Sequence, residues 1–356
     1  MHYPALDGIR GIAIILVILY HNFNFVEYFN YGWLGVDLFF VLSGFLITSI
    51  LLKTIHSKNY FRNFYAKRVL RIFPLYFLSL LVFIIILPAF HSFPLDMKYY
   101  QENQIWFWTY LQNWTLVFNQ KGQGTTLIHF WSLAVEEQYY FIWPILVLWI
   151  RKPKRLLFFC IILLLSVIIS RIMIWNYHES ISAWERLFLF SRIDGIIIGS
   201  MLATIHFINP LFVRKYFTTL ICSLVVINYL FYFLNRSYNY IFPSWAIAGF
   251  TTFASIFAFG IYEAIMKENK IINFFFTLPF FRFLGKYSYG FYIIHFPVFL
   301  LLKPYTDKFA AALFIPDSIY FLTTTSLLAT MAGLLVSILS FHLFEIHFLK
   351  LKKHFE

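Results

Sequence analysis

The chain has 356 residues, of which 61% are hydrophobic and only 12% are charged, and its mean hydropathy is +0.73. This composition excludes a soluble globular domain and predicts an all-α, polytopic integral membrane protein. The net charge of +12 does not indicate a nucleic-acid partner, because the basic residues gather in short loops between apolar segments, as they do in membrane proteins.

Ten apolar segments are long enough to cross a hydrocarbon core about 30 Å thick, at roughly 20 residues per helix. They are residues 9–26, 33–53, 74–91, 131–150, 156–176, 184–207, 216–234, 242–266, 287–303 and 317–346. The tryptophan-rich stretch 105–118 is shorter, and we expect an interfacial or re-entrant helix there. With no repeat, linker or cleavable signal sequence recognised, we expect one membrane domain over residues 1–356 and no fused soluble domain.

The distribution of basic residues predicts how these segments are oriented. If ten segments cross the membrane, the loops on the side of the N-terminus hold 19 lysine and arginine residues, and the opposite loops hold 6. Cytoplasmic loops carry the excess of positive charge in membrane proteins. The sequence therefore predicts that both termini are cytoplasmic.

Two ionisable residues stand out in the first apolar segment. Arg10 and His21 are eleven residues apart, so on a helix they project within about 20° of each other and about 16 Å apart along the axis. Asp7 falls close to the same stripe. An ionisable group at membrane depth costs about 2.5–3.5 kcal/mol on insertion scales and usually faces a polar cavity. His21 is therefore a candidate general base, with a helix-packing histidine as the alternative. Arg10 either anchors the helix at the interface or binds a phosphate.

Further along the chain, Arg68 and Arg71 are three residues apart on an amphipathic stretch and share a helix face. Two guanidinium groups there can bind phosphates in a bidentate manner, either of a substrate or of membrane lipid headgroups. Asp37 is a candidate partner for an intramembrane arginine. Ser43 with Gly44 indicates close helix packing and not a nucleophile, since no nucleophile-elbow motif surrounds it.

Glu136 and Glu137 lie near the start of the fourth segment and project about 100° apart, so only one of them can reach a given site. Instead of taking part in a site, a glutamate here could lie at the membrane interface and pair with Arg186 or Lys121. 

Three more residues are cavity candidates in later segments. Arg192 and Asp194 are expected to pair with other buried ions. His295, two residues before Pro297, either lines a cavity or packs between helices. No spacing typical of a metal site or of an ATP-binding loop occurs, so we expect no metal.

Six segments, in order along the chain, together resemble membrane acyltransferase family 3, a family of bacterial O-acetyltransferases that act on surface polysaccharides. The first resembles the family's motif of an arginine, ten residues and a histidine. The segments are LDGIRGIAIILVILYH (6–21), GVDLFFVLSGFLIT (35–48), AKRVLRIFPLY (66–76), WSLAVEEQYYFIWP (131–144), RIDGIIIGSMLA (192–203) and LGKYSYGFYIIHFPV (284–298).

The resemblance implies a membrane-bound O-acyltransferase in the plasma membrane of a bacterium. His21 would take the proton of an attacking hydroxyl or, alternatively, form a transient acyl-histidine. Arg10, Arg68 and Arg71 would bind acyl-CoA, with acetyl-CoA as the usual donor, at the cytoplasmic face. Glu136, which fits the family pattern, would orient or charge-stabilise His21 or hold the acceptor hydroxyl. The acceptor would be a carbohydrate or glycolipid.

Two other functions remain open from the sequence. The protein could be a conduit that passes acyl groups to a separate periplasmic transferase, because some family members carry a fused extracytoplasmic hydrolase-like domain that we do not recognise here. It could also be a solute transporter that uses the intramembrane charges, although that class predicts inverted repeats and broken helices.

Overall fold

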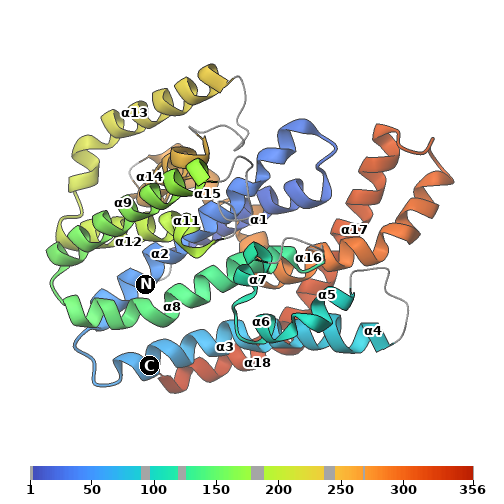
Figure 1. Cartoon of the computed structure of the whole chain (residues 1–356), viewed down its shortest axis with the longest axis horizontal. Coiled ribbons are helices and arrows are strands. Elements are labelled where there is room, and N and C mark those ends of the chain that lie inside the picture. Colours follow the sequence, from blue (N-terminus) through green and yellow to red (C-terminus); the bar gives the residue numbers. More distant parts are fainter. Residues whose placement is uncertain are drawn as a thin grey trace.

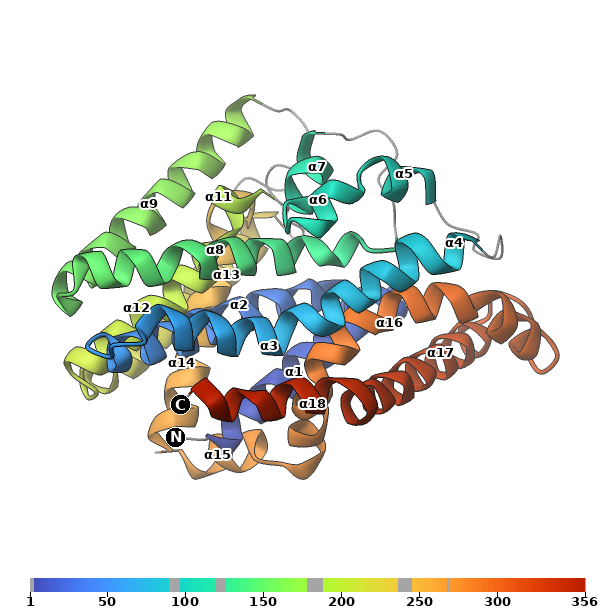
Figure 2. The same ribbon diagram turned by 90° about the horizontal axis from the view of Figure 1, so that it is seen from below.

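The structure is a computed structural model, and it describes residues 3–89, 97–118, 126–177, 188–235, 245–267 and 269–355. Within these ranges every regular element is a helix, as the composition predicts. The long helices pack as a bundle, and a group of short helices lies along one side of it (Figures 1 and 2).

Three helices form the N-terminal part. They are α1 (Pro4–Asn22), α2 (Leu34–Thr54), which follows the 3₁₀ turn Glu27–Trp33, and α3 (Tyr60–Leu80), which continues through a π-helical turn (Leu81–Ile86) into α4 (Leu87–Ala89). The predicted first span, 9–26, is therefore wrong at both ends. The third, predicted to begin at 74, starts at Tyr60, because Pro74 is accommodated inside one continuous helix.

The middle of the chain alternates short and long helices. They are α5 (Met97–Glu102), α6 (Gln104–Trp108), α7 (Gln112–Phe118), a 3₁₀ turn (Ile128–Phe130), α8 (Trp131–Ile150), α9 (Pro153–Tyr177), α11 (Leu189–Arg192), α12 (Asp194–Ile208) and α13 (Phe212–Asn235). The stretch 105–118 thus falls in two helices of five and seven residues, each too short to cross a membrane by itself, and its interfacial or re-entrant position stays a prediction.

The C-terminal part contains the longest helix. Its elements are a π-helical turn (Trp245–Gly249), α14 (Phe250–Met266), α15 (Lys270–Phe276), α16 (Pro279–Ala311), α17 (Ile319–Ser340), a second π-helical turn (Phe341–Glu345), α18 (Ile346–Lys350) and a 3₁₀ turn (Leu351–Phe355). In both views the two ends of the chain lie close together at the same end of the bundle.

Six helical segments of the described chain are long and apolar enough to cross a membrane. They are Pro4–Asn22, Glu27–Thr54, Tyr60–Ala89, Pro153–Asn176, Ile247–Met266 and Ile319–Phe355. Two shorter apolar helices, Asp194–Ile208 and Thr218–Leu234, also coincide with predicted spans. The other two predicted spans coincide with α8 and α16, which carry charged residues. The protein is a multi-pass membrane protein, while the count of ten spans and the orientation of the termini stay predictions.

Two helix pairs approach so closely that only glycine fits between them. A Cβ atom at Gly11 of α1 would overlap the carbonyl oxygen of Phe281 in α16, and one at Gly44 of α2 would overlap that of Ile196 in α12. The predicted packing role of Ser43 with Gly44 is confirmed for Gly44. These contacts bring α1 against α16 and α2 against α12, the pairs that position the site.

Candidate active site

Two cavities lie side by side in the bundle and contain most of the predicted site residues. The larger, of about 600 Å³, is lined by His21, His129 and Arg192 together with aromatic, amide and hydroxyl side chains; we call it the histidine cavity. The smaller, of about 110 Å³, is lined by Arg10, Arg68, Arg71 and Glu136; we call it the arginine cavity. Val36 and Tyr292 line both, so they form the partition between the two spaces.

A cluster of three imidazole rings lies at one wall of the histidine cavity, where His21 and His129 line the space and His295 lies buried beside them. His21, at the C-terminal end of α1, has its ring centroid 5.1 Å from that of His295 and 6.1 Å from that of His129, and the centroids of His129 and His295 are 5.0 Å apart. The Nδ1 atom of His21 lies 3.0 Å from the carbonyl oxygen of Val17, one turn back in the helix. Because a carbonyl oxygen can only accept, Nδ1 carries the hydrogen in the neutral ring. The Nε2 atom is then the basic nitrogen, and it has no hydrogen-bond partner among the residues that the structure describes.

His129 is a site residue that the sequence analysis missed. Its Nε2 atom lies 3.3 Å from the carbonyl oxygen of Ile293. That carbonyl is free of the helical ladder because the residue four positions later is Pro297, which has no backbone N–H group. The His129 side chain is almost fully buried, and its Nδ1 atom has no partner within the described part of the chain. Its place two residues before the Trp131-Ser132 motif is the signal that could have drawn attention to it.

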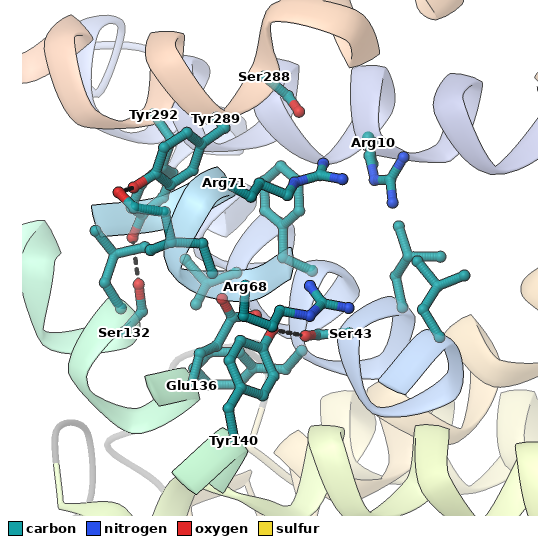
Figure 3. Close-up of a pocket in the computed structure, with 17 residues that line it drawn as sticks. Arg10, Ser43, Arg68, Arg71, Ser132, Glu136, Tyr140, Ser288, Tyr289 and Tyr292 are labelled. Atoms are coloured by element: carbon teal, nitrogen blue, oxygen red, sulfur yellow. Dashed lines mark hydrogen bonds between the residues drawn. The ribbon is translucent and has the colours of Figure 1, made fainter. Parts of the chain in front are cut away.

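The arginine cavity gathers three guanidinium groups from two helices. Figure 3 shows Arg10 of α1 and Arg68 and Arg71 of α3 around one space, with Arg68 beside Ser43, Glu136 and Tyr140. Arg10 is paired with Asp7, with 2.7 Å between Nη1 and Oδ1. Arg68 lies over the ring of Tyr140, 5.2 Å from its centroid. No carboxylate within the described ranges forms an ion pair with Arg68 or Arg71. Both residues lie within α3 and share the face that lines this cavity, as their spacing predicts.

Glu136 and Glu137 fall in different surroundings, as their angular separation predicts. Glu136 faces the arginine cavity, so its predicted contact with His21 is wrong: His21 lines the other cavity, and its ring contacts His295. Glu137 lines neither cavity, and its Oε1 atom is buried without a hydrogen-bond partner among the described residues. The alternative partners Arg186 and Lys121 lie outside the described residues.

The remaining charged candidates form buried ion pairs, which confirms their predicted pairing. Arg192 donates to Asp37, with 2.7 Å between Nη2 and Oδ1, and its guanidinium lies 4.0 Å from the ring centroid of Phe250. Asp194 pairs with Arg171, at 2.8 Å, and accepts from the hydroxyl of Thr251. Of these residues only Arg192 lines the histidine cavity. Buried pairs of this kind hold helices in register, because separating them leaves an uncompensated charge.

A metal centre requires several histidine, cysteine or carboxylate ligands around one point. Within the part of the chain that the structure describes, no three histidine, cysteine, aspartate or glutamate side chains are placed to hold a metal ion. 

The chain belongs to a family of membrane acyltransferases. The family described as "Acyltransferase domain" matches residues 3–343, nearly the whole chain. The two cavities therefore lie within the acyltransferase domain, because the three histidines and three arginines fall in the matched range.

Similar proteins of known name are bacterial O-acetyltransferases. The chain is 30% identical over 321 residues to the peptidoglycan O-acetyltransferase OatA of Listeria monocytogenes, an alignment that covers 85% of this chain and 50% of OatA. It is 29% identical over 320 residues to YrhL of Bacillus subtilis, provisionally named a peptidoglycan O-acetyltransferase, with 85% and 49% covered. The chain therefore spans about half the length of the curated relatives it matches. No solved structure matches it.

Proposed function

We propose that this protein transfers an acetyl group from acetyl-CoA to a hydroxyl of a cell-surface carbohydrate, with His21 as the general base. The observation that carries the proposal is the basic Nε2 atom of His21 in a cavity of ligand size, directly beside a cavity with three guanidinium groups. An acyl acceptor and a phosphate-bearing donor could then meet across one shared partition.

The arginine cavity suits the donor. Coenzyme A carries phosphate groups, and guanidinium groups bind phosphates with charge-assisted, bidentate hydrogen bonds. Arg68 and Arg71 form no direct ion pair in the described chain, and of the cavity's lining only Glu136 carries a carboxylate, so an anionic donor would meet an excess of positive charge. At about 110 Å³ the cavity can hold only a part of the donor.

The histidine cavity suits a carbohydrate acceptor. Its walls combine the rings of Trp33, Trp131 and Phe296 with the amides of Asn24 and Asn30. Flat apolar rings can cover the C–H face of a sugar, while amides bind its hydroxyl groups. Peptidoglycan, which the name of the Listeria relative gives as its acceptor, is one such carbohydrate.

The transfer needs one proton acceptor and returns the proton at the end. The Nε2 atom of His21 takes the proton of the acceptor hydroxyl while its oxygen attacks the carbonyl carbon of the thioester. The carbon–sulfur bond breaks, and the departing sulfur of CoA receives the proton back from the imidazolium. The variant in which His21 itself is acetylated first uses the same nitrogen and the same leaving group.

The proposed orientation puts the arginine cavity toward the cytoplasm and the histidine cavity toward the outside of a bacterial plasma membrane. The excess of basic residues in the loops on the N-terminal side supports it. Labelling of cysteines introduced at Lys58 and Asn59 with an impermeant maleimide tests it: protection in intact cells is expected, and labelling there would reverse the orientation.

The activity can be tested with the purified full chain in liposomes, given radiolabelled acetyl-CoA and chitopentaose, an N-acetylglucosamine oligomer. We expect labelled chitopentaose from the wild type and none above background from His21→Asn, which keeps a donor for the carbonyl of Val17. Equal labelling by the two would overturn the role of His21. Delivery of acetyl groups only to an added transferase would favour the conduit, and solute uptake without any thioester would favour a transporter.

A further inference from the structure

The ring of His295 lies beside the hydrogen-bearing nitrogen of His21. Its Nδ1 atom lies 2.7 Å from the carbonyl oxygen of Tyr292 and 3.1 Å from that of Phe291, both in its own helix. Two carbonyl oxygens can only accept, so Nδ1 of His295 carries a hydrogen. In the neutral ring the other nitrogen, Nε2, is then a hydrogen-bond acceptor.

That acceptor faces His21. The Nε2 atom of His295 lies 3.3 Å from the Nδ1 atom of His21, the same atom that lies 3.0 Å from the carbonyl oxygen of Val17. The Nδ1–H group of His21 is therefore shared between two acceptors. If His295 were protonated, two N–H groups would face each other across this distance, so the geometry favours the neutral ring.

The consequence is a fixed tautomer for His21. With its hydrogen held on Nδ1 by both Val17 and His295, the ring presents a basic Nε2 atom in the histidine cavity. When His21 accepts a proton, the bond to His295 remains and becomes charge-assisted, which makes it stronger in the reacting state than in the resting state. A group that binds the transition state more tightly than the ground state raises kcat rather than lowering KM.

We propose that His295 is a positioning residue that holds His21 in its Nδ1–H tautomer and stabilises the imidazolium formed during transfer. This inference rests on the proposed function. It assigns to His295 the orienting role for which the sequence suggested Glu136.

The surroundings of His295 make it suitable for this role. Its side chain is 1% exposed, so water does not compete for Nε2. It sits one residue before Phe296 and two before Pro297, where α16 meets α1 and the 3₁₀ turn that carries His129. The acceptor is thus held by the packed backbone of three elements, as preorganisation of a base requires.

The test compares two variants of equal length. In His295→Gln the amide oxygen can accept from His21, and in His295→Met the side chain is as long but lacks a strong acceptor. Steady-state rates are measured with the purified full chain, acetyl-CoA and chitopentaose. We expect kcat to fall about tenfold or more in His295→Met, the equivalent of one lost hydrogen bond of about 1.4 kcal/mol, with both KM values unchanged. His295→Gln should recover most of that loss.

His342→Met is the matched control, because it also removes an imidazole hydrogen bond to α16, the one to the hydroxyl of Tyr287, outside both cavities. It should keep the wild-type kcat. If kcat fell equally in His295→Gln and His295→Met, or if only a KM value changed, the positioning role would be overturned while the proposed function stands. An inactive wild type with an intact fold would instead count against the proposed function itself.

Discussion

The two cavities share a partition but differ in the kind of polar group they present. The arginine cavity collects three permanent positive charges beside the carboxyl group of Glu136, and two of these charges form no direct ion pair within the described chain. The histidine cavity collects neutral imidazoles whose hydrogens are held by backbone carbonyls, and its one arginine is neutralised by Asp37. Fixed charge suits the capture of an anionic donor, whereas a basic nitrogen suits proton transfer. This difference predicts that substitutions in the arginine cavity change the KM for acetyl-CoA, whereas substitutions of the histidines change kcat.

The largest effect is expected from the catalytic base. His21→Asn should lower kcat by about 10²–10⁴-fold, the usual contribution of general base catalysis, because it removes the nitrogen that accepts the proton of the hydroxyl. The KM for acetyl-CoA should stay near the wild-type value, as the donor binds in the other cavity. Steady-state kinetics with varied acetyl-CoA measure both constants. A variant with normal kcat and a raised KM would break the proposed division.

A change of similar size is expected in the free energy of unfolding when the ion pair between Asp37 and Arg192, beside the histidine cavity, is broken. Asp37→Ala leaves Arg192 buried without its carboxylate, which should lower the free energy of unfolding by about 3–5 kcal/mol. Asp307→Ala, which breaks the partly exposed pair with Lys303, should cost only about 0–1 kcal/mol. Denaturant unfolding in detergent compares the two. Equal costs would mean that the buried pair does not stabilise the bundle.

The next largest effect concerns the donor. Arg71→Gln should raise the KM for acetyl-CoA about 10–100-fold, the range for a lost hydrogen bond to a charged group, with little change in kcat. Arg62→Gln is the matched control on the same helix, since its guanidinium lies over the ring of Phe355 and not in the cavity. Isothermal titration with CoA checks binding directly. Unchanged CoA affinity in Arg71→Gln would remove the donor from this cavity.

The smallest effect should arise at the partition. The hydroxyl of Tyr292 lies 2.6 Å from that of Ser132 and donates to the carbonyl of His129 at 2.8 Å (Figure 3 shows the contact with Ser132). Tyr292→Phe keeps the ring but loses both bonds, so the partition should open more often. We expect hydrolysis of acetyl-CoA in the absence of acceptor to rise about two- to tenfold relative to transfer. Ser132→Ala, which loses one of these bonds, should give a weaker rise. A constant ratio in both would mean that the partition does not separate the reactants.

The relative positions of side chains on a single helix could be predicted from their spacing in the sequence. The spacing of Arg68 and Arg71 puts both in one cavity, and the angle between Glu136 and Glu137 separates them, because each follows from the turn of a single helix. The apolar runs likewise coincide with helices, although the ends of α1 and α3 were displaced. The polar residues before Pro74 suggested that the span begins after them, whereas Arg68 and Arg71 belong to the same helix and line an interior cavity.

Contacts between distant segments could not be predicted in this way. Glu136 was assigned to His21, but the angular position of a residue does not say which neighbouring helix its face meets. The role of His129 depends on a carbonyl that Pro297 releases, and the contact spans 164 residues of sequence. Asp37 and Arg192 are 155 residues apart. The sequence predicted that each forms an ion pair, but not which residue is its partner.

The contact of Gly11 with the backbone of Phe281 has a consequence for how mutations in this chain would be tolerated. It lies nearly three helical turns from His21, yet any side chain there would push α1 away from α16, the two helices that carry His21 and His295. In a saturation screen scored by growth or glycan modification, Gly11 would therefore rank with the reactive imidazole itself. A position that contacts no reactant would look indispensable because it sets the spacing of two that do.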